Sequence, residues 1–197
     1  QQHEMLTGMN HPQNPAYGNR EIPFAREIYI EQDDFMEDAP RKFFRLSVGR
    51  EVRLRFAYYI TCQQIIRNDD GSISHLICTY DPESRGGKSA DGRKVKGTIH
   101  WVSAAHALDA RVNLYDRLFN TPTPGAEPDF VATINPESLQ RREHAKLEPA
   151  VEVTGNQLSY QFERLGYFIN DPDSTPQQPV FNRTMTLRDS WAKIEKS

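Results

Sequence analysis

The sequence predicts an all-β protein of short antiparallel strands with small helices at its corners. Runs rich in β-branched and aromatic residues, such as Thr98–Val102, have the composition that packs well on a pleated sheet. Turn-forming residues separate such runs, as at Asp69-Asp70-Gly71. The segments that begin with residues typical of a helix N-terminus are short. Short strands joined by turns are typical of compact β architectures such as barrels.

The N-terminal part is predicted to contain a loosely ordered segment, a short strand and a short helix. Residues 1–20 are polar and rich in Asn, Gln, Pro and Gly, which predicts a loosely ordered lead-in. Glu27–Ile30 is expected to form a short strand. Asp38 can cap a helix with Pro40 in its first turn, so we expect a helix from there to about Leu46.

A β-hairpin is predicted in the next segment. Its strands would be Glu51–Arg67 and Ser72–Tyr80, joined at the Asp69-Asp70-Gly71 turn. Apolar and charged residues alternate at the start of the first strand, so one face would be apolar and the other largely cationic. The apolar positions are Val52, Leu54 and Phe56, and the charged ones are Glu51, Arg53 and Arg55.

The second half of the chain is predicted to contain further strands and two short helices. Thr121–Pro128 has the composition of a linker. Asn135 followed by Pro136 is typical of a helix N-terminus, with Asn135 as the cap and Pro136 in the first turn. A short terminal helix is expected at Ser190–Lys196. The expected strands are residues 148–153, 159–168 and 180–187.

Charge and composition exclude several classes of protein. The net charge is −3 with a pI near 6.1, so this is no generic polyanion binder, and a nucleic-acid site must gather its cations on one face. No segment approaches the roughly 18 apolar residues that span a bilayer, and the N-terminus lacks the regions of a signal peptide. We therefore expect a cytoplasmic protein without a membrane partner. In a reducing cytosol Cys62 and Cys78 are expected to be free thiols.

The most informative stretch runs from Asp91 to His106. It contains a turn, three cations at the entrance of a strand, and the sequence Gly-Arg-Lys-Val-Lys-Gly-Thr-Ile-His-Trp-Val-Ser-Ala. This sequence closely resembles a characteristic run in the C-terminal anticodon-binding region of glutaminyl-tRNA synthetases. Other blocks resemble the same family in the same order: Pro23-Phe24, Glu27–Ile30, Gly49–Arg55, Cys78–Asp81, Leu114–Phe119, Ile134–Leu139, Gln161–Arg164, Gly166–Phe168, Pro179–Arg183 and Leu187–Trp191.

The resemblance implies a fold of two small antiparallel β-barrels with short corner helices. The distal barrel would span residues 40–118. The proximal barrel would combine residues 1–39, which include the polar lead-in, with residues 119–197, which begin with the linker. In the family, the proximal barrel also uses strands that would precede Gln1, so the chain resembles a fragment of a longer enzyme.

The resemblance implies that the full enzyme is a class I aminoacyl-tRNA synthetase that ligates glutamine to its tRNA with ATP and Mg²⁺. The His-Ile-Gly-His and Lys-Met-Ser-Lys-Ser motifs of the ATP site are absent here, and His100 and His106 have no obvious nucleophile beside them. We therefore expect no catalytic residue, cofactor or metal within this chain. The expected partners are the anticodon loop of glutamine tRNA and the protein's own N-terminal catalytic domain, and the expected state is a monomer.

The resemblance also assigns anticodon contacts to residues with suitable chemistry. A guanidinium can pair two acceptors, an amide can distinguish uracil from cytosine, and cations bind phosphates. Arg45 matches the arginine at the third anticodon base, a guanine. Arg53 and Arg55 match arginines near the first base and its phosphate, and Arg188 matches a terminal arginine near the barrel junction. The residues that match the cluster at the middle base, a uracil, are Gln161, Glu163 and Arg164.

The residues around Arg45 depart from the family pattern. Lys42 stands where some relatives have glutamine, and Phe44 stands where they have lysine, so a hydrogen bond and a cation near the third base are altered. Lys42 and Arg41 could compensate. On the predicted helix, Arg41 and Arg45 are one turn apart and would share a face.

Alternation supports an outward position for Gln161. Tyr160 and Phe162 would face the core, and Arg164 would point inward unless a bulge or the Gly166 turn re-aims it. The outward positions would be Ser159, Gln161 and Glu163. The pattern also fits an ordinary polar outer face. Two other functions stay open: the related barrels of a glutamyl-tRNA synthetase, and a β-barrel module that binds RNA or protein without a synthetase role.

Overall fold

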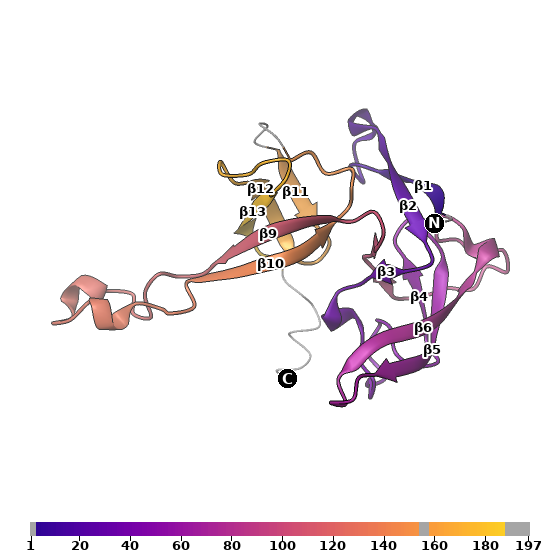
Figure 1. The fold of residues 1–197 in the computed structure, drawn as a ribbon, viewed down its shortest axis with the longest axis horizontal. Coiled ribbons are helices and arrows are strands. Elements are labelled where there is room, and N and C mark those ends of the chain that lie inside the picture. The colour runs from indigo at the N-terminus through magenta and orange to yellow at the C-terminus, as the bar shows by residue number, and fades with distance from the viewer. Residues whose placement is uncertain (1–2, 154–157, 188–197) are drawn as a thin grey trace. The chain divides into compact units, whose positions relative to one another are not determined.

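The computed structural model describes residues 3–153 and 158–187, and in this part the chain forms two compact units. Unit 1 runs to Ala107 and includes Glu148–Ala150, whereas unit 2 comprises Leu108–Leu147 and the described residues from Val151 onward (Figure 1). An ion pair ties the short 148–150 segment to unit 1, because Arg20 Nε lies 2.5 Å from Glu148 Oε2. In the described residues every helical segment is a three-residue 3-10 turn, and none could cross a membrane.

Unit 1 begins with a hairpin of β1 (His3–Met9) and β2 (Asn19–Ala25). The prediction of a loosely ordered lead-in was therefore wrong for residues 3–9 and 19–20, which form strands. The strands are polar, but Leu6 and Ile22 lie opposite each other and are 3% and 2% exposed. These two side chains join the core of unit 1, so their burial stabilises strands that composition alone does not indicate.

The main sheet of unit 1 has four strands in the order β6-β5-β4-β7. Strands β4 and β7 are parallel, and the other pairs are antiparallel. A second, two-stranded sheet pairs β3 with β8. The bounds are β3 Ile28–Tyr29, β4 Glu51–Leu54, β5 Tyr59–Arg67, β6 Ile73–Asp81, β7 Thr98–Ile99 and β8 Val102–Ser103.

Two predicted strands of unit 1 are interrupted. Instead of one strand at Glu51–Arg67, β4 ends at Leu54 and β5 begins at Tyr59, because Phe56 adopts a φ of 61° in the intervening turn. The predicted Thr98–Val102 strand is also split. The indole Nε1 of Trp101 donates a hydrogen bond of 2.9 Å to the carbonyl of Arg55, which fixes the indole against this turn.

The helix predicted from the Asp38 cap to about Leu46 is absent, and the segment is a loop held by hydrogen bonds, here called the clamped loop. The guanidinium of Arg50 donates hydrogen bonds to the carbonyls of Ala39, Pro40 and Phe43 at 2.9–3.2 Å. The Leu46 N–H donates to Asp34 O, which holds this end of the loop against the segment before it. The capping signal at Asp38 and Pro40 involves neighbouring residues only. The contacts that fix the loop are made with Arg50 and Asp34, which lie outside the predicted helix.

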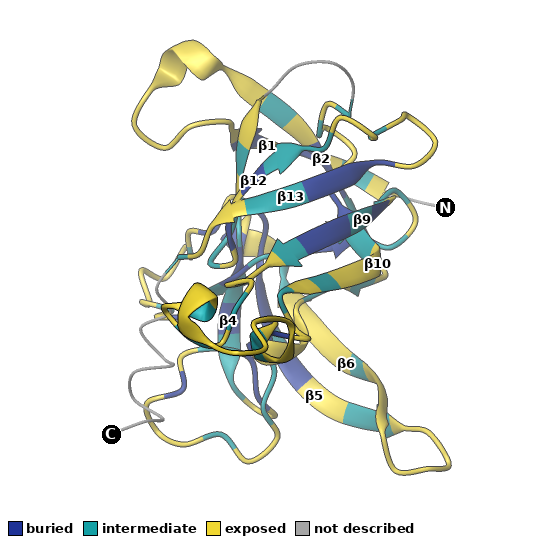
Figure 2. Ribbon diagram, turned by 90° about the vertical axis from the view of Figure 1, so that its left-hand side faces the viewer, coloured by how far each residue is buried: buried dark blue, intermediate teal, exposed yellow. Residues whose placement is uncertain are grey.

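Unit 2 is built on one five-stranded sheet in the order β10-β9-β13-β12-β11. Strands β13 and β9 are parallel and the other neighbours are antiparallel. Figure 2 shows the buried residues concentrated in β9 and β13, in the middle of the sheet, whereas β10 at the edge is mostly exposed. The bounds are β9 Leu108–Tyr115, β10 Leu139–Leu147, β11 Ser159–Phe162, β12 Gly166–Asn170 and β13 Val180–Met185.

Three element predictions in the second half of the chain were wrong. Asn135 starts no helix; its Oδ1 accepts from the Glu137 N–H in a turn that leads into β10. Residues 148–153 form no strand, and residues 159–168 form a hairpin instead of one strand. The segment between β9 and β10 is a long loop that extends away from the sheet and returns to it (Figure 1). The predicted terminal helix at Ser190–Lys196 lies outside the described residues.

The all-β prediction is confirmed, and the small corner helices are 3-10 turns of three residues. They are η1 Pro15–Tyr17, η2 Gln32–Asp34, η3 Pro82–Ser84, η4 Pro124–Ala126 and η5 Val131–Thr133. The assignment of residues 1–39, 40–118 and 119–197 to proximal and distal barrels stays a prediction. Cys62 and Cys78 are free thiols that lie directly opposite each other on β5 and β6.

Candidate nucleic-acid interface

The clamped loop of unit 1 presents cations to solvent. Arg41 and Lys42 are both exposed, at the turn that Arg50 holds through three carbonyls. Because Arg50 donates to main-chain carbonyls, its own guanidinium is occupied in shaping the loop. The exposed cations of the loop are therefore displayed from a backbone with a fixed conformation.

Arg45 is held in place at the other end of this loop. Its Nε lies 3.5 Å from Asp34 Oδ1, and its Nη1 donates a hydrogen bond of 2.9 Å to the carbonyl of Asp33. The side chain of Asp34 is 1% exposed and that of Arg45 is 11% exposed. A guanidinium fixed in this way has little rotamer entropy left to lose on binding a ligand.

Arg53 and Arg55 extend from the end of β4, and both stack on aromatic rings. The guanidinium of Arg53 lies 5.5 Å from the Tyr59 ring centroid, and its Nε is buried without a hydrogen-bond partner. Gly87 makes room for this side chain, since a Cβ there would lie 2.8 Å from Arg53 Cδ. Arg55 lies 5.0 Å from the Phe56 ring. Stacking holds both cations in preferred orientations.

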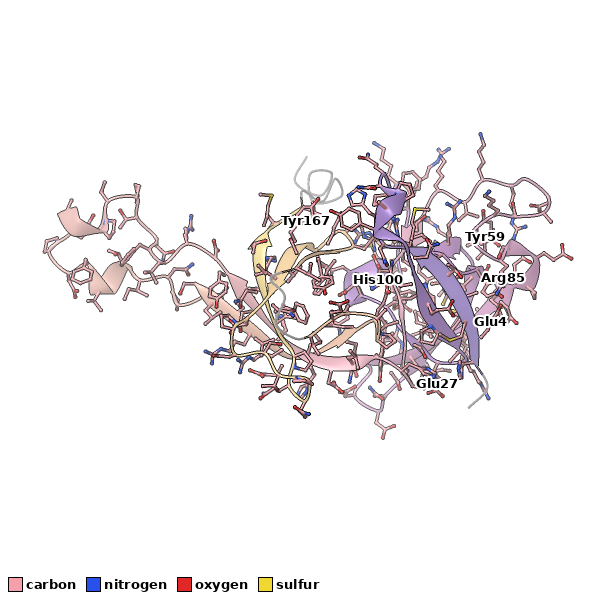
Figure 3. All side chains as sticks on the ribbon, turned by 90° about the horizontal axis from the view of Figure 1, so that it is seen from above. Glu4, Glu27, Tyr59, Arg85, His100 and Tyr167 are labelled. Carbon is pink, nitrogen blue, oxygen red and sulfur yellow. The ribbon has the colours of Figure 1, made fainter. Side chains whose placement is uncertain are left out.

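Some cations of unit 1 are paired with carboxylates or lie over an aromatic ring. Arg93 makes ion pairs with Glu51 at 2.8 Å, with Asp81 at 2.5 Å and with Asp91 at 2.9 Å. These carboxylates, Glu51 first, raise the pKa of Arg93. Arg85 is paired with Glu4 at 2.6 Å, and the two residues lie close together in Figure 3. Of the cations at the entrance to β7, Lys96 instead lies over the ring of Phe44.

The β11–β12 hairpin of unit 2 presents Gln161 outward. Gln161 is exposed, and the flanking Tyr160 and Phe162 are half-buried and pack against Phe181 with ring centroids 5.9 and 5.7 Å away. Phe162 also stacks on Phe168 at 4.3 Å. These inward aromatic contacts fix the outward direction of Gln161, as alternation along the strand predicts.

Glu163 and Arg164 lie in the hairpin turn and not on the strand. β11 ends at Phe162, so Glu163 lies beyond the strand and the argument from alternation does not extend to it; its outward position stays a prediction. Arg164 has a φ of 61°, the left-handed conformation, and the Leu165 N–H closes the turn on Phe162 O at 2.9 Å. Arg164 therefore lies in the turn before Gly166, where the alternation of a strand no longer sets the direction of a side chain.

The sequence-based prediction missed Tyr167 as a neighbour of Gln161. Tyr167 is the direct cross-strand partner of Gln161, and Met185 is the partner of Tyr167 on the next strand. Tyr167 and Met185 are 36% and 63% exposed, and Figure 3 labels Tyr167 on unit 2. Cross-strand partners share one face of a sheet. Treating residues 159–168 as a hairpin would have revealed this row, because Phe168 then faces inward and Tyr167 outward.

The structure groups the predicted residues into two sets, one in each unit. Arg41, Lys42, Arg45, Arg53 and Arg55 belong to unit 1, and Gln161, Glu163 and Arg164 belong to unit 2. Arg188 lies outside the described residues. Among residues 3–153 and 158–187, no group of three His, Cys, Asp or Glu side chains could hold a metal ion. The chemistry that the two sets offer is recognition through cations, amides and aromatic faces.

Comparison with known proteins finds one family and similar relatives over almost the whole chain. Two family models, both described as the anticodon-binding domain of class I (E and Q) tRNA synthetases, match residues 1–81 and 98–171. Among curated proteins, the chain is 52% identical over 192 residues to a glutamine–tRNA ligase of Bradyrhizobium diazoefficiens. It is 53% identical over 193 residues to those of Nitrobacter winogradskyi and Proteus mirabilis.

These alignments cover 98% of this chain but only 34–35% of each relative. The chain thus spans about a third of the length of the curated relatives that it matches.

Proposed function

Since the chain belongs to the family of anticodon-binding domains of class I (E and Q) tRNA synthetases, we propose that it binds the anticodon loop of glutamine tRNA. The family description covers both glutamate and glutamine enzymes. The relatives compared above, at 52–53% identity, are glutamine–tRNA ligases, which supports glutamine tRNA as the partner. The whole protein would join glutamine to this tRNA with ATP and Mg²⁺, which its catalytic domain would bind. This chain would act by recognition alone, in a monomeric cytoplasmic enzyme.

The observation that carries this proposal is the outward pair of Gln161 and Tyr167 on the β11–β12 hairpin. An amide offers both a donor and an acceptor, so it can match the polar edge of uracil and discriminate against cytosine. An exposed aromatic ring on the same face offers a surface on which an unstacked base can lie. Splayed single-stranded bases are recognised through this combination of stacking and edge hydrogen bonds.

The cations of unit 1 are a second, separate set of proposed contacts. Arg53 and Arg55 would bind the first base and its phosphate, and Arg45 would recognise the third base, a guanine. Arg41 and Lys42 would bind phosphates nearby. Arg164, from the hairpin turn, would contact the middle base, and Glu163 would orient a neighbouring cation. Arg188 would act near the barrel junction. Phosphate contacts position the loop, whereas base contacts give specificity.

Replacing Gln161 with alanine tests the recognition of the middle base. The variant should weaken binding to an anticodon hairpin with the native uracil by about 1–3 kcal/mol, the usual discrimination of a good base contact. It should weaken binding much less when cytosine replaces that uracil, because the wild-type amide makes no matched contact there. Fluorescence anisotropy with both labelled hairpins, at one fixed salt concentration, measures the difference.

Gln63 provides a matched control. It is an exposed glutamine on a strand of unit 1, where its Nε2 donates to Thr79 Oγ1 at 3.0 Å, and Gln63→Ala should bind both hairpins like the wild type. If Gln161→Ala weakens both hairpins equally, or neither, then Gln161 does not discriminate the middle base.

A further inference from the structure

Phe44 is an exposed aromatic residue on a rigid part of unit 1. Its side chain is 51% exposed, whereas the adjacent Phe43 is 2% exposed and anchors the loop in the core. The backbone of Phe44 lies directly against Gly97, because a Cβ on Gly97 would come within 2.3 Å of Phe44 O. Gly97 in turn accepts a hydrogen bond of 2.9 Å from the Arg53 N–H on β4. The ring is therefore held out to solvent from a backbone that cannot easily move.

The surroundings of the ring are cationic. Lys96 Nζ lies 5.1 Å from the ring centroid, and Arg41 and Lys42 are exposed two or three residues away in the same loop. Residues 39–50 contain no Asp or Glu. Of the acids that flank this loop, Glu37 pairs with Arg67 and Glu51 pairs with Arg93, and Asp38 is exposed six positions before Phe44.

We propose that Phe44 is a stacking platform for an unpaired base of the bound RNA loop, with Lys96 and the cations of the clamped loop placed to bind the adjacent phosphates. The inference rests on the proposed function and adds to it a contact through the face of a base. Aromatic faces set among cations are the combination by which proteins bind single-stranded nucleic acid, because every base has a face that can stack. A solvated phenyl ring without such a role leaves its apolar surface in water.

The two features of this surface should contribute separately. Stacking on the ring is not an ionic interaction, so it should be insensitive to salt, whereas Lys96 should contribute through release of counterions. The Lys96 ammonium over one region of the ring also restricts the ring's orientation. The ring and the cation thus predict different signatures in a binding experiment.

The test compares Phe44→Leu, which keeps an apolar side chain without an aromatic face, with Phe44→Trp, which keeps the face. Binding of the 197-residue chain to a labelled anticodon hairpin of glutamine tRNA is measured over a series of salt concentrations. Phe44→Leu should weaken binding by about 5- to 100-fold with an unchanged salt slope. Phe44→Trp should bind at least as tightly as the wild type. Lys96→Gln should instead reduce the slope by about 0.7.

Phe130 is a matched control, because it is a phenylalanine of similar exposure, 53%, beside the acids Glu127 and Asp129. Phe130→Leu should not change the affinity. Hairpins that lack one loop base at a time then locate the contact, since the effect of Phe44→Leu should vanish for the hairpin that lacks the stacked base.

The outcomes separate the inference from the proposed function. If the wild-type chain binds the hairpin and Phe44→Leu binds equally well, the inference is overturned and the ring serves a protein contact or none. If the effect of Phe44→Leu persists in every hairpin that lacks a base, the contact is not stacking. If the wild-type chain does not bind the hairpin at all, the proposed function itself fails, and the inference fails with it.

Discussion

Replacing Gly166 with alanine is expected to lower the free energy of unfolding of unit 2 by about 2–5 kcal/mol and to displace the β11–β12 hairpin. Gly166 has a φ of 146°, which residues with a side chain rarely adopt. A Cβ would also lie 2.2 Å from the carbonyl oxygen of Met185, which is backbone and cannot rotate away. Backbone strain and overpacking therefore add at one position. Because Gly166 begins the strand that pairs with Gln161, RNA binding should fall as well.

Hydrogen exchange gives a measurement specific to this unit. The amides of β11, β12 and β13 should lose protection in Gly166→Ala, while those of β4 and β5 in unit 1 keep theirs. Gly125 serves as the control, because it has no heavy atom within 4 Å of its would-be Cβ and no positive φ. Gly125→Ala should leave exchange unchanged. Unaltered protection in Gly166→Ala would mean that the hairpin adapts to a side chain at this position, contrary to the described geometry.

Removing the carboxylate of Asp34 is expected to destabilise unit 1 by about 3 kcal/mol, because breaking a buried ion pair leaves an uncompensated charge. Asp34 is 1% exposed, and its partner Arg45 is only 11% exposed and cannot reach bulk water without moving. In Asp34→Ala, Arg45 would keep the carbonyl of Asp33 but lose the Asp34 carboxylate. The same change should weaken RNA binding, since the guanidinium would no longer be held in a preset position.

The buried Trp101 reports on unit 1, and its fluorescence during denaturant unfolding follows the effect once Trp191 has been changed to phenylalanine. Asp33→Ala is the matched control, because the side chain of Asp33 is exposed and its contribution to Arg45 is a main-chain carbonyl. The control should unfold at the wild-type denaturant concentration. Equal midpoints for the two alanine variants would show that the Asp34 carboxylate contributes little to the position of Arg45.

The sequence was informative where structure is decided by neighbouring residues. The β5–β6 hairpin follows from a turn between two β-rich runs, and the inward direction of Tyr160 and Phe162 follows from simple alternation. The resemblance of many short blocks to one family was confirmed by the family models and by the relatives. The predicted roles of individual residues in binding RNA stay predictions.

The missed features depend on contacts between distant residues or on unusual backbone angles. The helix signals at Asp38 and Pro40 were overridden because Arg50, farther along the chain, binds the carbonyls of this loop. The positive φ angles of Phe56 and Arg164 have no local signal, since neither residue is a glycine. The clamped loop, the Phe56 turn and the Arg164 turn carry or adjoin candidate residues, so the backbone geometry around these residues could not be predicted from the sequence.

The proposal that this chain recognises an anticodon is tested most directly by its affinity for two tRNA transcripts that differ only in the anticodon bases. One is glutamine tRNA, and the other carries changed middle and third bases on the same body. Anticodon recognition predicts at least about tenfold tighter binding of the native transcript, the value of one good base contact, maintained as salt is raised. Equal affinities with equal salt slopes would contradict it, because the binding would then be attraction between cations and phosphates alone.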